Sequence, residues 1–132
     1  MPLTLRLEPR SKIIVNGAVI ENLGAATSLA VHNNAKILKD KDVLTEADAN
    51  SPARRVYYAL QCAYLFEQGR GEYVALFDRL AGEYLEAAPS ARTVITEVRG
   101  EVAAERYYAA LRACRKLMDH ESERLERAPS AA

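Results

Sequence analysis

Apolar and polar residues alternate in the first third of the chain, with the period of two that is typical of strands. In residues 3–7 three leucines fall on one face, which predicts a half-buried strand. The pair Asn16-Gly17 lies between two runs rich in β-branched residues, and because both residues tolerate a positive φ it predicts a hairpin. Two further strands are expected at Ser28–His32 and Lys36–Lys39. Residues 3–40 are therefore predicted to form a small antiparallel sheet.

From residue 52 onward the apolar spacing changes to three and four residues, the period of an amphipathic helix. The ranges that we expect to be helical are residues 52–67, 71–87 and 92–127. Gly100 is expected to kink the last of them. Because three or four strands alone cover their apolar face poorly, we expect the helices to cover the sheet.

The predicted fold class is therefore α+β, with the strands first and the helices second. At 132 residues the chain has the size of one domain that can bury a core without disulfides or metal. We expect a single domain with these parts: a β part at residues 1–45, a helical part at 50–127 and a frayed tail at 128–132.

The first predicted helix begins at a clear capping signal. Ser51 can accept a hydrogen bond from the first turn, and Pro52 suits the first helical position, where its missing N–H leaves nothing unpaired. Arg54 and Arg55 then lie in the first turn, where the helix dipole favours negative charge by roughly 0.3–1 kcal/mol per charge. The sequence thus predicts an anion near them. Three candidates for this anion stay open: a phosphate, an acidic partner protein, or the acidic residues upstream, which are Asp40, Asp42, Glu46 and Asp48.

Charge is balanced over the whole chain, with 18 basic and 18 acidic side chains. No global positive field draws such a chain to nucleic acid, so any contact with RNA must be local. The basic residues around the connection from sheet to helix are the candidates for an RNA or anion site: Lys36, Lys39, Lys41, Arg54 and Arg55. The alternative is structural, with Arg54 and Arg55 pairing to Asp40, Asp42 or Asp48.

Tyrosine is the abundant aromatic residue, with seven copies and no tryptophan. Neighbouring residues differ by about 100° around a helix axis, so one member of an adjacent pair should face outward. An outward ring can stack on an RNA base or contact a partner protein, and packing at the rim of the core is the alternative. The residues concerned are Tyr57, Tyr58, Tyr107 and Tyr108.

Few residues are arranged for catalysis. The sequence has no glycine-rich phosphate loop, no G-x-S-x-G and no HExxH motif. We expect His32 to lie on the surface of a strand, and His120 to be solvated at an exposed helix end. Cys62 and Cys114 lack metal-site spacing and are predicted to be free, buried thiols. We therefore expect no enzyme activity, no cofactor and no metal.

The N-terminal residues lack an apolar core of signal-peptide length, and no run approaches the roughly 20 apolar residues of a membrane span. We therefore expect a cytoplasmic protein without membrane contact.

Three segments, in order, resemble the FlbT family, the flagellar biosynthesis repressors of alphaproteobacteria: VNGAVIEN, NNAKILKDKDVLTEADANSPARRVYYALQCAYL and ERYYAALRACRKLMDHE. The block SPARRVYYALQ, preceded by KDKDVL, is the most specific part, and the resemblance extends to about Glu121. It implies a post-transcriptional regulator of flagellin synthesis. Such a regulator associates with the 5′ untranslated region of flagellin mRNA and acts together with a small helical partner, FlaF. Where the family is expected to have a basic loop, residues 22–28 carry no charge.

Two hypotheses follow. In the first, the chain binds a flagellin leader RNA, with phosphates on the basic cluster and a base stacked on Tyr57 or Tyr58. In the second, it is a protein-interaction module or chaperone-like partner of FlaF or flagellin, and its effects on translation are indirect. Zero net charge and outward tyrosines favour the second. An exposed sheet edge also makes a homodimer through strands an expectation.

Overall fold

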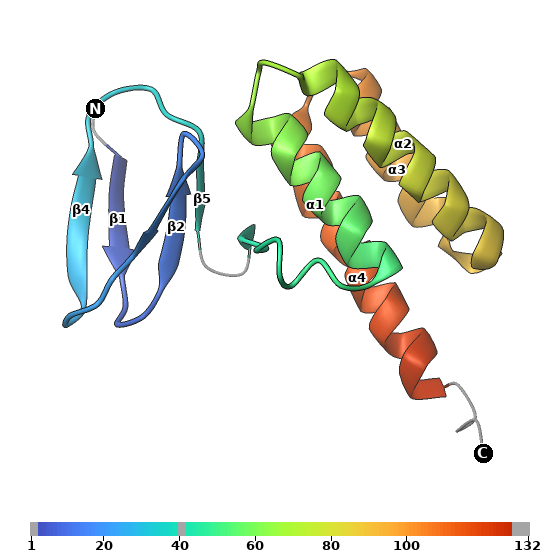
Figure 1. Ribbon diagram of the computed structural model, residues 1–132, viewed down its shortest axis with the longest axis horizontal. Coiled ribbons are helices and arrows are strands. Elements are labelled where there is room, and N and C mark those ends of the chain that lie inside the picture. The colour runs from blue at the N-terminus through green and yellow to red at the C-terminus, as the bar shows by residue number, and fades with distance from the viewer. Residues whose placement is uncertain (1–2, 40–41, 128–132) are drawn as a thin grey trace. The chain divides into compact units, whose positions relative to one another are not determined.

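The computed structural model has strands in the first third of the chain and helices in the remainder (Figure 1), which confirms the predicted α+β class. It describes residues 3–39 and 42–127, without the side chains of residues 126 and 127. Asp40, Lys41 and the predicted tail at residues 128–132 lie outside the described residues. The chain divides into two compact units, Met1–Val43 and Leu44–Ala132, here called the strand unit and the helical unit. That the helices cover the sheet stays a prediction.

The strand unit holds five strands: β1 (Leu3–Leu7), β2 (Lys12–Val15), β3 (Ala18–Glu21), β4 (Thr27–Val31) and β5 (Ile37–Lys39). They form two antiparallel sheets instead of the predicted one, because β1 pairs with β4 while β2 lies between β3 and β5. Local alternation specifies a strand and its faces but not its partner. The bounds of each strand were therefore predicted to within one residue, but the division of the strands into two sheets was not predicted.

The hairpin between β2 and β3 forms as predicted. Asn16 and Gly17 have φ values of 49° and 88°, the two positive angles that a type I′ turn requires. The Asn16 side chain accepts a hydrogen bond from the Lys36 N–H at 2.9 Å, and its N–H donates to the Lys36 carbonyl at 2.9 Å. These two bonds fix the turn to the start of β5.

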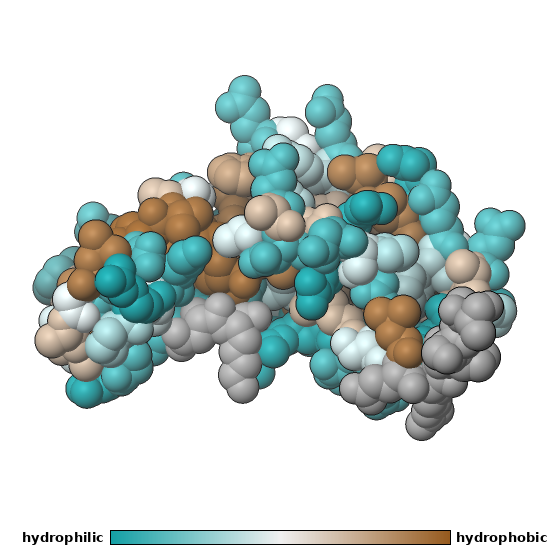
Figure 2. Space-filling model, turned by 60° about the horizontal axis from the view of Figure 1, so that its bottom comes forward, coloured by the Kyte–Doolittle hydropathy of each residue, from teal (hydrophilic) through white to brown (hydrophobic). Residues whose placement is uncertain are grey.

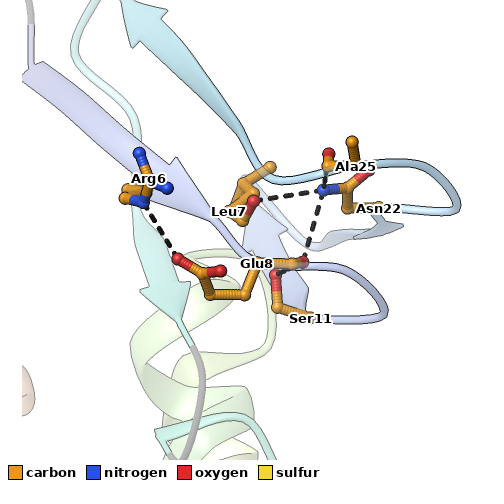
Figure 3. Close-up of polar contacts among 6 residues, drawn as sticks. All are labelled: Arg6, Leu7, Glu8, Ser11, Asn22 and Ala25. Carbon is orange, nitrogen blue, oxygen red and sulfur yellow. Dashed lines mark hydrogen bonds and ion pairs between the residues drawn. The ribbon is translucent and has the colours of Figure 1, made fainter.

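Asn22 fixes the uncharged loop that follows β3 (Figure 3). Its side-chain amide donates to the carbonyls of Leu7 at 3.1 Å and Ala25 at 3.0 Å, and its carbonyl oxygen accepts from the Gly24 N–H at 3.0 Å. The loop is thereby attached to the end of β1 by one side chain. It needs no charged residue to hold its shape.

The helical unit contains α1 (Pro52–Leu65), α2 (Arg70–Ala87), the 3-10 helix η2 (Pro89–Ala91), α3 (Arg92–Ala103) and α4 (Tyr107–Arg127). Helix α1 packs against α2 and α4, and α3 packs against α4. The large side chains buried between them include Tyr57, Leu60, Phe77, Ile95, Leu111 and Leu117. Among the residues that the structure describes, no helix combines the length and apolar character needed to cross a lipid bilayer.

The prediction of one continuous helix over residues 92–127 was wrong. The helix breaks after Ala103, and Gly100 is not the cause, because Glu105 adopts a left-handed φ of 60°. The Arg106 N–H donates to the Glu101 carbonyl and the Glu105 N–H to the Val102 carbonyl, each at 2.9 Å, which is the Schellman ending. Glycine usually occupies this position, so no local signal indicated that the helix ends there.

The segment before α1 is attached to that helix through a buried amide. Gln61, only 3% exposed, donates to the Leu44 carbonyl at 2.8 Å and accepts from the Leu44 N–H at 2.9 Å. Both polar ends of this side chain are therefore satisfied by one residue. The bonds fix where the chain enters the helical unit.

Candidate functional site

The N-terminus of α1 is capped as the sequence predicts. Ser51 has extended backbone angles, and its hydroxyl accepts a hydrogen bond from the Arg54 N–H at 3.3 Å. The predicted anion is also present, but it comes from the far end of the sequence. The Ser51 hydroxyl donates to one carboxylate oxygen of Glu121, and the Ala53 N–H donates to the other at 2.9 Å.

Glu121 was not among the suggested sources of the anion. It belongs to the C-terminal helix and lies 68 residues from Ala53, whose N–H donates to it. A phosphate bound directly to this N–H would have to displace the carboxylate. We therefore expect an external anion to bind the arginine side chains farther out, and a phosphate on the arginine pair stays a prediction.

Arg54 and Arg55 both point to solvent. One guanidinium nitrogen of Arg54 donates to the Asn50 side chain at 3.0 Å. Among the described residues of the helical unit no carboxylate forms an ion pair with either arginine, and Asp48 instead accepts a hydrogen bond from the Thr45 hydroxyl at 2.9 Å. Asp48 therefore does not neutralise the pair; Asp42 belongs to the strand unit and Asp40 lies outside the described residues, so pairing with either of them stays a prediction.

The predicted basic cluster is drawn from both units of the chain. Lys36 and Lys39 belong to the strand unit, are half-buried and already take part in interactions. Lys41 lies outside the described residues. The five cationic residues are thus divided between two units, and a joint site for them stays a prediction.

Arg55 lines two hollows on the helical unit. The first has a volume of about 570 Å³, and its walls include Leu80, Tyr84, Glu121 and Arg124. The second has a volume of about 490 Å³, and its walls include Tyr58, Tyr73, Cys62, Leu76 and Glu46. A single exposed guanidinium therefore borders both recesses. We call these the α4 hollow and the tyrosine hollow.

The tyrosine pairs differ in what they can contact. Tyr57 is fully buried, so the candidate role of its ring in stacking or partner contact was wrong: it packs into the helix core. Tyr58 is half-buried in the tyrosine hollow, where burial is the main cause that raises the pKa of its hydroxyl. Tyr107 lies under the Arg70 guanidinium, 4.8 Å from its ring centre. Tyr108 is exposed as predicted, 5.7 Å from the Tyr64 ring centre.

His120 is half-buried and hydrogen-bonded, whereas we expected it to be solvated at an exposed helix end. Its two ring nitrogens lie 2.9 Å from the Tyr84 hydroxyl and 2.8 Å from the Ser90 hydroxyl. These contacts join α4 to α2 and to η2. The sequence missed this role because the contacts span 30 and 36 residues, and no local pattern specifies them. The thiols Cys62 and Cys114 are free and buried, as predicted.

Comparisons with known proteins place the chain among flagellar proteins. A family model described as flagellar protein FlbT matches residues 3–125. A probable flagellum biosynthesis repressor protein FlbT of Rhodopseudomonas palustris is 35% identical over 127 residues, which cover 96% of this chain and 100% of the relative. The flagellum biosynthesis repressor protein FlbT of Caulobacter vibrioides is 33% identical over 127 residues, covering 95% and 90%. No solved structure matches the chain.

Proposed function

The chain belongs to the FlbT family of flagellar proteins, and from this premise we propose that it regulates flagellin synthesis after transcription by binding the 5′ untranslated region of flagellin mRNA. The names of its relatives, repressors of flagellum biosynthesis, support a regulatory role in flagellum synthesis. The proposal requires no catalysed reaction and no cofactor. It requires a cytoplasmic protein, because leader RNA is translated there.

One observation carries the proposal: Arg54 and Arg55 are exposed and have no carboxylate partner among the described residues of the helical unit. Positive charge in the first turn of a helix is unfavourable by roughly 0.3–1 kcal/mol per charge. A bound phosphate offsets this cost, because guanidinium and phosphate form paired, charge-assisted hydrogen bonds. With Glu121 already on the helix amides, the phosphate binds to the outer side of the arginine pair.

The tyrosine hollow supplies a place for a base beside that phosphate. Arg55 borders it, and the rings of Tyr58 and Tyr73 lie in its walls with the apolar side chain of Leu76. Single-stranded RNA is commonly held by a cation on the backbone and an aromatic ring on the base, at roughly 1–3 kcal/mol per stacked base. The proposed contact is therefore one unpaired nucleotide of the leader, with its phosphate on Arg55.

Binding of a flagellin leader transcript to purified protein tests the proposal, measured by fluorescence anisotropy at fixed salt. We expect Arg54→Ala/Arg55→Ala to weaken binding about tenfold, the equivalent of roughly 1.4 kcal/mol. The matched control is Arg92→Ala/Lys116→Ala, which removes the same charge from exposed positions outside both hollows. Equal losses in the two variants would remove the site, and no binding by the native chain would remove the direct mechanism.

A second function is favoured by the α4 hollow. Its apolar wall, from Leu80, Ala87 and Leu125, is bordered by the charged residues Glu83 and Arg124. This arrangement suits the apolar face of a partner helix, which binds through residues spaced three and four apart. The partner would be FlaF or flagellin, and RNA effects would then be indirect. Co-purification that is lost in Leu125→Asp, while leader binding persists, would favour this function over the first, because Leu125 lines the α4 hollow and not the tyrosine hollow.

A further inference from the structure

The strand unit exposes an uncharged, apolar surface. Residues 13–31 carry a single charge, on Glu21. Hydrophobic side chains gather on the strand unit in Figure 2, and its exposed large ones are Leu3 (52%), Val19 (59%), Ile20 (42%), Leu23 (71%) and Leu29 (40%). Together they expose on the order of 450 Å² of apolar surface, and this area is spread over both faces of β3 because Val19 and Ile20 are neighbours along the strand.

Strand β3 is an edge strand with apolar residues on both faces. Val19 and Ile20 point to opposite faces, and both are exposed, whereas their partners on β2, Ile14 and Ile13, are buried. Strands that are apolar on both faces are normally internal to a sheet. The sequence of β3 thus suits a strand with neighbours on both sides, but within the described residues it has only β2.

The outer edge of β3 is also open for backbone pairing. Val15 and Ala18 flank the two-residue turn and exchange backbone hydrogen bonds, so the N–H and C=O of Val19 are directed away from β2. Natural edge strands are commonly blocked by lysine or proline, and β3 contains neither. Strand β4, which pairs only with β1 among the described strands, contains no charge at all.

We propose that a second copy of this chain binds the surface formed by β3, Leu23 and β4, and that the two copies join edge to edge through β3. A helix cannot pair with an open strand edge, because its own backbone groups are bonded internally. An antiparallel pairing of β3 with its copy sets Ile20 opposite Ile20 and Glu21 opposite Val19. No like charges then oppose each other, and one surface serves both copies, as two-fold symmetry requires.

The size of the strand unit also agrees with a dimer. Edge-to-edge pairing brings the exposed side chains on both faces of β3 next to those of the second copy. The strand unit also ends at Val43, close to the size of about 40 residues below which small folds usually need oligomerisation or cross-links. The proposal concerns this unit and does not depend on RNA binding.

Sedimentation velocity of the full chain between about 1 and 100 μM tests the proposal. We expect twice the chain mass of 14.6 kDa at the upper concentrations. Leu23→Lys and Val19→Lys should each raise the dissociation constant at least tenfold. Phe66→Lys is the control, because Phe66 is also an exposed apolar residue (38%) but lies in the helical unit outside both hollows, and it should leave dimerisation unchanged.

Hydrogen exchange on the native chain provides a test that needs no variant. The Val19 amide, directed outward, should become protected as the concentration rises, while the neighbouring Ile20 amide, bonded to β2, should be equally protected throughout. A monomer at every concentration would overturn the proposal. Protection of Val19 that does not vary with concentration, as when another part of the same chain covers β3, would overturn it as well.

Discussion

Replacing Glu121 tests whether the C-terminal helix supplies the anion at the start of α1. Its carboxylate accepts two hydrogen bonds, from the Ser51 hydroxyl and the Ala53 N–H, at the positive end of the helix. A hydrogen bond to a charged group contributes roughly 1.5–3 kcal/mol where it is shielded, and less where water competes. Because this site is only partly buried, we expect Glu121→Ala to lower the free energy of unfolding by about 2 kcal/mol.

Urea denaturation, followed by circular dichroism at 222 nm, measures this change. Glu123→Ala is the matched control, since it removes the same charge from the same helix at an exposed position. We expect the control to change the unfolding free energy by no more than about 0.5 kcal/mol. Glu121→Gln keeps the shape and one acceptor but loses the charge, so its loss should be intermediate.

Sulfate provides a second readout of the same site. In Glu121→Ala the Ala53 N–H and the Ser51 hydroxyl lose their carboxylate, and the helix N-terminus becomes available to an external anion. Sulfate should therefore stabilise this variant more than it stabilises the Glu123→Ala control. Equal stability of the two variants, with equal responses to sulfate, would refute the reasoning that Glu121 caps α1.

Two further predictions concern the helical unit. Glu105→Gly should raise the free energy of unfolding by about 1 kcal/mol in the same urea assay, because Glu105 has a left-handed φ of 60° that glycine adopts without strain; a destabilised variant would contradict this. Burial raises the pKa of the Cys114 thiol to about 12, so its proton is held more tightly in the folded state. The contribution of this protonated thiol to the free energy of unfolding is complete at pH values below the ordinary pKa of 9.0, and it is lost as the pH rises from there toward about 12. In that interval the free energy of unfolding of the native chain should therefore fall by up to about 1.4 kcal/mol per pH unit relative to that of Cys114→Ala. Parallel plots of unfolding free energy against pH for the two proteins would contradict this prediction.

Local signals in the sequence were sufficient for the parts of the fold that depend on neighbouring residues. The Asn16-Gly17 turn requires positive φ at both positions. Ser51 caps helix α1, which begins at the next residue, Pro52. The Schellman ending of α3 could not be predicted from the sequence, because Glu105 occupies the left-handed position where glycine is the usual signal. Strand pairing did not follow either, since alternation is the same whichever partner a strand takes.

In the candidate site, too, local signals could be read from the sequence, whereas contacts between distant residues could not. The need for an anion at the start of α1 follows from the charges of Arg54 and Arg55 in its first turn. That the anion is Glu121 could not be derived, because its contact joins residues far apart in the chain. The burial of Tyr57 and the two hydrogen bonds of His120 likewise depend on how helices pack, which a single sequence does not specify.

The salt dependence of leader binding tests the central claim most directly. Each phosphate contact on single-stranded RNA contributes about −0.7 to the slope of log K against log salt concentration. If the pair Arg54 and Arg55 holds one phosphate, the slope of Arg54→Ala/Arg55→Ala should be shallower than that of the native chain by about 0.7. Identical slopes for the two proteins, with leader binding intact, would show that the exposed arginine pair does not contact the RNA.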